Sequence, residues 1–327
     1  MSRILVTRAF PGPGIASLND HGFEVDLFDR DEIIPRKELL QRVKGVDALL
    51  SLLTDKIDAE VMDAAGPSLK IIANYAVGFD NVDLDAAKKR NIIVTNTPVS
   101  EMSESVAEFT MALMFAVARR VCEADVFTRE KKYTGWSPNL FLGMDLRGKT
   151  LGVIGAGRIG TRVAEMARLG LGMSIVYTSR KPDPDLSTRL SAPFLPLDQV
   201  LERADVVTLH VPLLPDTKHL ISTEQFSLMK KDAILLNTSR GPIVDEKALL
   251  RALRTGRIAG AGIDVYEAEP AIDTDPSDKL ELRAMPNVVM TPHIASATIQ
   301  TREAMGRLAV ANIVAVLTGE KPLSAAG

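Results

Sequence analysis

The chain has 327 residues, of which 46% are hydrophobic and 25% are charged, a composition typical of a globular protein. This length exceeds what one hydrophobic core usually serves, so we expect two domains. The formal net charge of -3 excludes a basic field that would hold nucleic acid or an anionic membrane, and the single cysteine, Cys122, excludes a disulfide framework and a thiolate metal cluster.

The N-terminal third of the chain alternates strand-like and helix-like segments. The strand-like runs are RILVTR, FEVDLF, DALLSLL, KIIANYA and NIIVT, and PRKELLQRV and DAEVMDAAG between them have helical character. This alternation predicts a doubly wound α/β unit. No signal-peptide core precedes the first strand and no apolar stretch has the length of a membrane span, so we expect a cytoplasmic protein.

A long apolar helix is predicted next. Ser105 and Glu108 have the spacing of a capping box, and residues 106–118 are almost all apolar. A helix that is apolar on all sides must be buried. Two interpretations stay open: an interior helix of one core, or a helix that joins two domains and contributes to a dimer interface.

A second α/β pattern starts at Lys149. Its strand-like runs are TLGVI, SIVYT, DVVTLHVP, AILLNT, IAGAGID and NVVMT. Residues 301–317 then have helical character and can return to the first domain. Two α/β units in one chain predict a cleft between them.

A dinucleotide-binding signature follows the first strand of this second pattern. Gly155, Gly157 and Gly160 form a GxGxxG motif after TLGVI, and the motif opens the helical segment RIGTRVAEMARLG. The glycines allow a tight turn, close approach of a pyrophosphate and close helix packing, with the helix N-terminus facing the phosphates. The alternative, a purely structural glycine turn, is disfavoured by the strand and the helix on either side.

The end of the next strand predicts which nicotinamide cofactor is preferred. An NAD-selective site places an acidic residue there for the ribose 2′-hydroxyl, whereas an arginine accommodates a 2′-phosphate. Here the strand is followed by Ser179, Arg180 and Lys181, and the first acid is Asp183. We therefore expect NADPH to be preferred, with NADH as an alternative. The competing interpretation is that Arg180 and Lys181 are ordinary surface charges.

Three strand-like runs are followed by an arginine, a glutamate and a histidine. Arg240, Glu269 and His293 each lie beyond such a run, and in a parallel sheet the carboxyl ends of the strands share one edge. An arginine grips a carboxylate and polarises the adjacent carbonyl, and a histidine with a carboxylate partner is a general acid near neutral pH. We therefore predict a carbonyl reduction in which the nicotinamide gives hydride and His293 gives the proton.

The remaining histidines do not indicate a metal site. No His, Cys or Asp cluster has the spacing of metal ligands, so we expect no metal. His210, in a loop after a strand, is expected to line the cofactor cleft, whereas His21 and His219 are interpreted as surface residues.

Together these motifs resemble the D-isomer-specific 2-hydroxyacid dehydrogenases, and most closely their glyoxylate and hydroxypyruvate reductase branch. The likeness covers nearly the whole chain and is carried by LLTDKID, NYAVGFDNVD, SESVAEFTMAL, DLRGKTLGVIGAGRIG, LHVPLLPDTKHLI, LLNTSRGPIVDE, GAGIDVYEAEP and TPHIASAT. It implies a homodimer of chains with two doubly wound α/β domains. These are a flavodoxin-like substrate domain, residues 1–99 and 295–327, and an inserted Rossmann cofactor domain, residues 100–294.

The resemblance also implies site residues. The substrate would meet Leu53, the backbone amides of Ala76, Val77 and Gly78, and the side chains of Arg240 and His293. The cofactor would meet Gly155, Gly157, Arg158, Ile159, Gly160, Ser179, Arg180, Lys181, His210, Val211, Pro212, Thr217, Thr238, Ser239, Arg240, Asp264, His293 and Ala295, with Asp264 near the nicotinamide carboxamide. Trp136 lies in a segment that resembles one closing the active site of the partner subunit. The alternative interpretation is that Trp136 is a packed anchor within its own chain.

The sequence favours one function and leaves two others open. The favoured one is NADPH-dependent reduction of glyoxylate to glycolate and of hydroxypyruvate to D-glycerate, because a pocket lined by Leu53 suits a short side chain. The alternatives are an NAD-linked dehydrogenase for a bulkier D-2-hydroxy acid and a nucleotide-sensing, corepressor-like binding protein that retains the trio.

Overall fold

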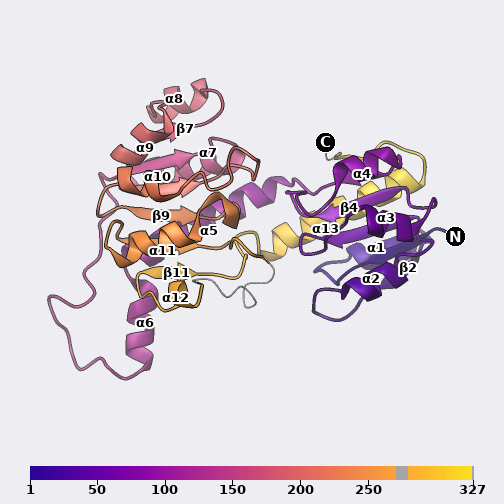
Figure 1. The fold of residues 1–327 in the computed structure, drawn as a ribbon, viewed down its shortest axis with the longest axis horizontal. Helices are drawn as coiled ribbons and strands as arrows, with labels where there is room; N and C mark the ends of the chain where they lie inside the picture. The colour runs from indigo at the N-terminus through magenta and orange to yellow at the C-terminus, as the bar shows by residue number, and fades with distance from the viewer. Residues whose placement is uncertain (270–278, 326–327) are drawn as a thin grey trace. The chain divides into compact units, whose positions relative to one another are not determined.

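The computed structural model describes residues 1–269 and 279–325 and divides the chain into two compact units. Unit 1 comprises Met1–Met102 and Ala297–Gly327, and unit 2 comprises Ser103–Ser296. Each unit is an α/β fold around a parallel sheet, which confirms the predicted fold class. Figure 1 shows the path of the chain through both units.

Unit 1 contains a five-stranded parallel sheet in the order β2-β1-β3-β4-β5. This is the flavodoxin-like order, as predicted. Strands β3 and β4 are central and almost wholly buried, which explains their nearly continuous apolar sequences ALLSL and IIANY. The strands are β1 (Arg3–Val6), β2 (Glu24–Leu27), β3 (Ala48–Leu52), β4 (Ile71–Tyr75) and β5 (Ile93–Thr95).

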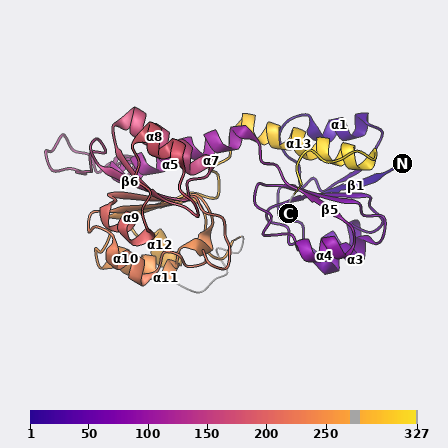
Figure 2. The same ribbon diagram turned by 90° about the horizontal axis from the view of Figure 1, so that it is seen from above.

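Helices cover both faces of this sheet (Figure 2). On one face lie α1 (Gly14–Asp20) and α13 (Ile299–Leu317); on the other lie α2 (Arg36–Arg42), α3 (Ala59–Ala65) and α4 (Leu84–Lys89). Glycines allow close packing on the first face, because a Cβ at Gly14 or Gly306 would lie 2.8 or 2.7 Å from the ring of Phe10. The C-terminal helix therefore packs within unit 1, as predicted.

Unit 2 contains a six-stranded parallel sheet in the order β11-β10-β9-β8-β6-β7. An isolated parallel bridge between Tyr177 and Phe194 adds a minimal strand outside β7. Counted with this bridge, the strands follow the Rossmann order 3-2-1-4-5-6, extended by one. The strands are β6 (Thr150–Ile154), β7 (Ser174–Thr178), β8 (Val206–Leu209), β9 (Ile234–Asn237), β10 (Gly260–Ile263) and β11 (Val288–Met290).

Two apolar cores, one on each face of the sheet, hold unit 2 together. The first face carries α5 (Ser100–Ala118), α7 (Arg158–Glu165), its π-helical extension η1 (Met166–Gly170) and α8 (Pro184–Leu190). The second carries α9 (Leu197–Arg203), α10 (Thr223–Leu228), α11 (Glu246–Arg254) and α12 (Lys279–Arg283). A short 3-10 helix, η2 (Gly241–Ile243), follows β9.

The predicted capping box is wrong. Helix α5 begins at Ser100, five residues before Ser105, which lies buried inside the helix. The helix starts early because Pro98 ends the preceding extended segment and residues 100–104 continue the helical backbone. The helix starts in unit 1 and ends in unit 2, so it joins them covalently. It is not buried on all sides, since Phe115 is 41% exposed.

The segment after α5 buries little of itself against its own chain. Helix α6 (Val121–Arg129) has no buried residue, and Trp136 is 83% exposed. The interpretation of Trp136 as a packed anchor is therefore wrong within this chain. No helix among the described residues combines the length and apolarity that a membrane crossing needs.

Candidate functional site

The carboxyl ends of the strands of unit 2 form one edge of its sheet. Neighbouring strands are parallel, and the direction of winding reverses between β6 and β8. Ligands of open α/β sheets bind outside the strand ends at such a reversal. The predicted cofactor residues all follow these ends: Arg158, Ile159 and Gly160 lie in the first turn of α7, and the others lie in the loops after β6, β7, β8, β9, β10 and β11.

The three glycines of the GxGxxG loop have different reasons to be glycine. Gly155 has a φ of 100°, and a Cβ there would lie 2.7 Å from the His210 backbone. A Cβ on Gly160 would lie 2.0 Å from the Gly155 carbonyl oxygen, so this glycine lets α7 approach β6. A Cβ on Gly157 would meet nothing within 4 Å, and its φ of -85° suits any residue. Gly157 therefore leaves open space at the start of α7, where a pyrophosphate would bind.

The loop after β7 has two exposed cationic side chains, and its one carboxylate is engaged in capping the next helix. Arg180 and Lys181 are exposed, and neither side chain has an ion-pair or hydrogen-bond partner in the part of the chain that the structure describes. Ser179 donates its hydroxyl proton to the Lys181 carbonyl. The Asp183 carboxylate caps α8, accepting from the backbone N–H of Asp185 at 2.9 Å and of Leu186 at 3.2 Å.

The loops after β8 and β9 are fixed to one another. The Ser239 hydroxyl donates to the Val211 carbonyl, and the Thr238 hydroxyl lies 2.9 Å from that of Thr110 on α5. His210 is half-buried, with Nε2 2.9 Å from the Thr208 hydroxyl, and burial lowers its pKa to about 3. His210 is therefore neutral near pH 7 and does not supply protons there.

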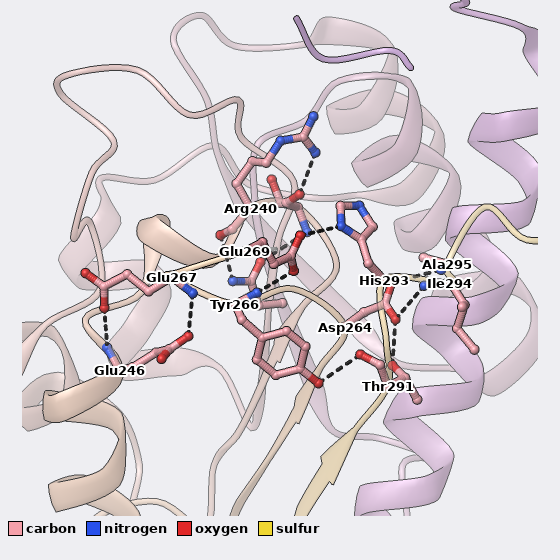
Figure 3. A network of polar contacts seen from close by, with 12 residues as sticks. Arg240, Glu246, Asp264, Tyr266, Glu267, Glu269, Thr291, His293, Ile294 and Ala295 are labelled. Carbon is pink, nitrogen blue, oxygen red and sulfur yellow. Dashed lines mark hydrogen bonds and ion pairs between the residues drawn. The ribbon is translucent and has the colours of Figure 1, made fainter. Parts of the chain in front are cut away.

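The loops after β10 and β11 bring two of the three predicted chemical groups together. His293 Nδ1 lies 2.7 Å from Glu269 Oε2, and the other oxygen, Oε1, accepts from the Tyr266 backbone N–H at 2.7 Å (Figure 3). The two side chains are 27% and 22% exposed. An ionised carboxylate only accepts hydrogen bonds, so Nδ1 carries a proton and Nε2 is left for chemistry.

Asp264 holds the histidine loop in an uncommon backbone conformation. His293 has a φ of 56°, in the left-handed region that non-glycine residues seldom adopt. The Asp264 carboxylate accepts from the Thr291 hydroxyl at 2.6 Å and from the N–H groups of Ile294 at 2.9 Å and Ala295 at 2.8 Å. Burial raises the pKa of Asp264, and the Thr291 hydroxyl opposes this by stabilising the charged form.

These contacts show what the Asp264 carboxylate holds within the chain. Its side chain is fully buried, and its two oxygens serve the loop at residues 291–295. A contact of Asp264 with a nicotinamide carboxamide stays a prediction. The Tyr266 hydroxyl adds to the same frame by donating to the Thr291 carbonyl at 2.8 Å, and burial raises the pKa of this phenol.

Arg240 is carried by a loop that packs directly on the glutamate loop. A Cβ on the next residue, Gly241, would lie 1.8 Å from the Tyr266 carbonyl carbon, so only glycine permits the contact. The Arg240 guanidinium donates to the Ser239 carbonyl at 2.8 Å, and the Arg240 carbonyl accepts from the Asn237 side chain at 2.9 Å. Arg240, Glu269 and His293 therefore occupy neighbouring loops of one frame (Figure 3).

In unit 1 the predicted substrate loop turns its carbonyls inward. The carbonyl of Ala76 accepts from the Thr97 N–H at 2.8 Å, that of Val77 from the Asn96 side chain at 2.7 Å, and that of Gly78 from the Asn74 side chain at 3.0 Å. The N–H groups of Val77 and Gly78 have no partner among the described residues. Successive backbone N–H groups without a partner are a type of group that can bind an anion.

The loop that carries Leu53 belongs to the same polar network of unit 1. The Asn81 side chain donates to the Leu52 and Asp55 carbonyls, each at 3.0 Å, and Leu53 itself is 36% exposed. Burial raises the pKa of Asp55, which accepts from the Leu52 N–H at 2.8 Å.

Sequence reasoning missed one residue beside the site. His219, interpreted there as a surface residue, has its Nε2 2.6 Å from Glu267 Oε1. The only signal in the sequence is the pair of glutamates two residues apart in YEAEP, which offers a carboxylate besides Glu269. Among the described residues, no group of three or more His, Cys, Asp or Glu side chains has the arrangement of a metal site.

The chain is similar to known proteins of one family. Residues 111–295 match the family model described as the D-isomer specific 2-hydroxyacid dehydrogenase, NAD binding domain. A curated relative named glyoxylate reductase, from Korarchaeum cryptofilum, is 49% identical over 322 residues, which cover 98% of this chain and 94% of the relative.

Solved structures agree. The TT0316 protein from Thermus thermophilus superposes with a TM-score of 0.92 at 48% identity, covering 99% of this chain and 100% of that one. An NADPH-dependent glyoxylate/hydroxypyruvate reductase from Sinorhizobium meliloti gives 0.84 at 32% identity, covering 100% and 98%. The chain therefore belongs to the D-isomer-specific 2-hydroxyacid dehydrogenase family, and unit 2 contains its nicotinamide-nucleotide-binding domain.

Proposed function

We propose that this protein reduces small 2-oxo acids, glyoxylate to glycolate and hydroxypyruvate to D-glycerate, with NADPH as the preferred reductant. The observation that carries the proposal is the 2.7 Å pair of His293 and Glu269 on the same frame as Arg240, at the strand edge that also holds the glycine loop. The names of the relatives from Korarchaeum cryptofilum and Sinorhizobium meliloti support this substrate class.

The proposed roles follow from the chemistry of each group. The Arg240 guanidinium binds the substrate carboxylate and polarises the adjacent ketone or aldehyde. A bound NADPH supplies the hydride to the carbonyl carbon. His293 Nε2 donates a proton to the carbonyl oxygen as negative charge develops there. The Glu269 carboxylate orients the imidazole ring by its hydrogen bond with His293 Nδ1. In the oxidative direction the neutral imidazole accepts the hydroxyl proton.

The preference for NADPH rests on the loop after β7. Arg180 and Lys181 are exposed cations without a partner in the described part of the chain, which suits a 2′-phosphate. The nearest acid in sequence, Asp183, is occupied as the cap of α8 and is not offered to a ribose hydroxyl. Charge and capping therefore both favour the phosphorylated cofactor.

For unit 1 we propose a substrate-binding role. Its loop at Val77 and Gly78 offers two N–H groups that suit the substrate carboxylate, and the exposed side chain of Leu53 lines the space for a short substituent. The remaining predicted cofactor contacts, among them Thr217, Pro212 and Ala295, are part of the same proposal.

We also propose that the protein is a cytoplasmic homodimer. Apolar side chains on α5, on α6 and in the segment after α6 face solvent in the single chain, among them Phe115, Val121, Val126, Leu142 and Trp136. Exposed apolar surface of this extent is typical of an interface. A second copy of the chain is the proposed cover for these side chains.

Initial rates of NADPH and NADH oxidation with glyoxylate, hydroxypyruvate and pyruvate test the proposal. We expect the highest kcat/KM with NADPH and the first two acids. Preference for NADH and a bulkier acid would favour an NAD-linked D-2-hydroxyacid dehydrogenase. Tight nucleotide binding without turnover of any 2-oxo acid would favour a nucleotide-sensing protein.

A further inference from the structure

We propose that His219 is a positioning residue that holds the Glu269 loop through Glu267; this inference rests on the proposed function of Glu269 and His293. His219 lies on the connection between β8 and α10 and belongs to none of the three loops that carry the proposed chemical groups.

His219 connects two of those loops directly. Its backbone N–H donates to the Pro242 carbonyl at 2.8 Å, two residues after Arg240. Its Nε2 lies 2.6 Å from Glu267 Oε1, two residues before Glu269. Its φ of 53° is again in the left-handed region, so surrounding contacts, not local preference, set this conformation.

Glu267 is itself fixed at both its carboxylate and its backbone. The Glu267 N–H donates to Glu246 Oε1 at 2.5 Å, and the Glu246 N–H lies 3.5 Å from Glu267 Oε2. Glu246 is only 6% exposed. The Glu267 carboxylate thus contacts the Glu246 backbone through Oε2 and His219 through Oε1. Figure 3 shows the Glu246 and Glu267 contacts beside Tyr266 and Glu269.

The connection from His219 to the proton donor is short. Glu267 follows Tyr266, whose N–H donates to Glu269 Oε1 at 2.7 Å, and Glu269 Oε2 in turn lies 2.7 Å from His293 Nδ1. The Tyr266–Glu267 peptide also lies against Gly241. A displacement of Glu267 therefore moves the peptide that orients the Glu269 carboxylate and on which the Arg240 loop packs.

The test compares His219→Leu with His219→Gln in the full-length protein. Leu removes the bond to Glu267, whereas Gln keeps a neutral donor of similar reach. At saturating NADPH and glyoxylate we expect Leu to lower kcat about 10-fold, the loss that a hydrogen bond to a charged group accounts for, with Gln restoring most of it. The Kd for NADPH, measured by fluorescence titration, should stay within about twofold in both variants.

A double-mutant cycle separates positioning from a general structural effect. In a Glu269→Gln background the His219→Leu change should have little further effect on kcat, because the two act through one carboxylate. An undiminished 10-fold loss in that background would overturn the inference. His21→Leu, at an exposed histidine bonded to the Ser17 carbonyl in unit 1, is the matched control and should leave kcat unchanged.

Failure of this inference and failure of the proposed function give different results. Without turnover of glyoxylate by the unmodified protein, or with full turnover by a His293→Ala variant, the proposed function itself fails. If the unmodified protein turns over glyoxylate and His293→Ala does not, but His219→Leu and Glu267→Gln both keep the wild-type kcat, only the role of His219 is refuted.

Discussion

The loop at His293 and the loop at residues 76–78 are both held in place by side chains of their own unit, but they expose different groups. Each follows a parallel strand, and each is held by partly buried hydrogen bonds, to Asp264 in unit 2 and from Asn74 and Asn96 in unit 1. The histidine loop presents a side chain, whereas the loop of unit 1 presents backbone N–H groups. The chemistry of the first therefore depends on the residue in the loop, and that of the second on the residues beneath it.

The largest effect on turnover is expected in the loop that carries His293. His293→Ala removes the proposed proton donor and should lower kcat on the order of 10²–10⁴-fold, the usual share of general acid catalysis. The Kd for NADPH should change little, because the imidazole is not a phosphate contact. Stopped-flow turnover together with a nucleotide titration checks both quantities. A loss confined to cofactor affinity would contradict the assignment.

A second side chain with a proposed role, Arg180, lies in the same unit, in the loop after β7. Arg180→Ser should raise the KM for NADPH about 10-fold while leaving that for NADH within about twofold, because only NADPH carries the 2′-phosphate. Arg189→Ser is the matched control: Arg189 is already paired with Glu165 and Asp185. Equal losses with both cofactors would remove the phosphate role.

The supporting residue in unit 1 should show a smaller and different effect. Asn96→Ala removes the donor that turns the Val77 carbonyl inward. We expect the KM for glyoxylate to rise about fivefold, the cost of one hydrogen bond, with a smaller change in kcat and none in NADPH binding. Asn19→Ala, at an exposed position of unit 1, serves as control. An unchanged KM would mean that the loop at residues 76–78 does not bind the substrate.

The smallest effect on the kinetic constants is expected from a side-chain change within the loop at residues 76–78. Val77→Ala keeps the backbone N–H and shortens a half-buried side chain, so KM and kcat should stay within about twofold of the unmodified values. Steady-state kinetics with glyoxylate decides the matter. A loss larger than that of Asn96→Ala would show that the valine side chain, not the backbone, contacts the substrate.

The same contrast explains what the sequence can predict. Arg240, Glu269 and His293 stand out because their side chains have distinctive chemistry and each follows an apolar run. The glycine motif and the strands are equally visible, since GxGxxG and parallel-strand runs are local patterns. These features require no knowledge of which distant residues meet.

Other features depend on distant contacts that no local pattern records. No local pattern pairs Asn96 with the Val77 carbonyl, or His219 with Glu267 across 48 residues. The hydrogen bonds from the buried Asp264 carboxylate to the histidine loop are equally invisible in the sequence. The predicted start of α5 is wrong because a side chain with capping-box spacing also fits inside a helix.

Gly157 separates the requirements of folding from those of ligand binding. The chain itself requires glycine at positions 155 and 160, but a methyl group at position 157 would meet only open space. A side chain added there would leave the packing of the fold unchanged and would act only on a ligand bound at the start of α7.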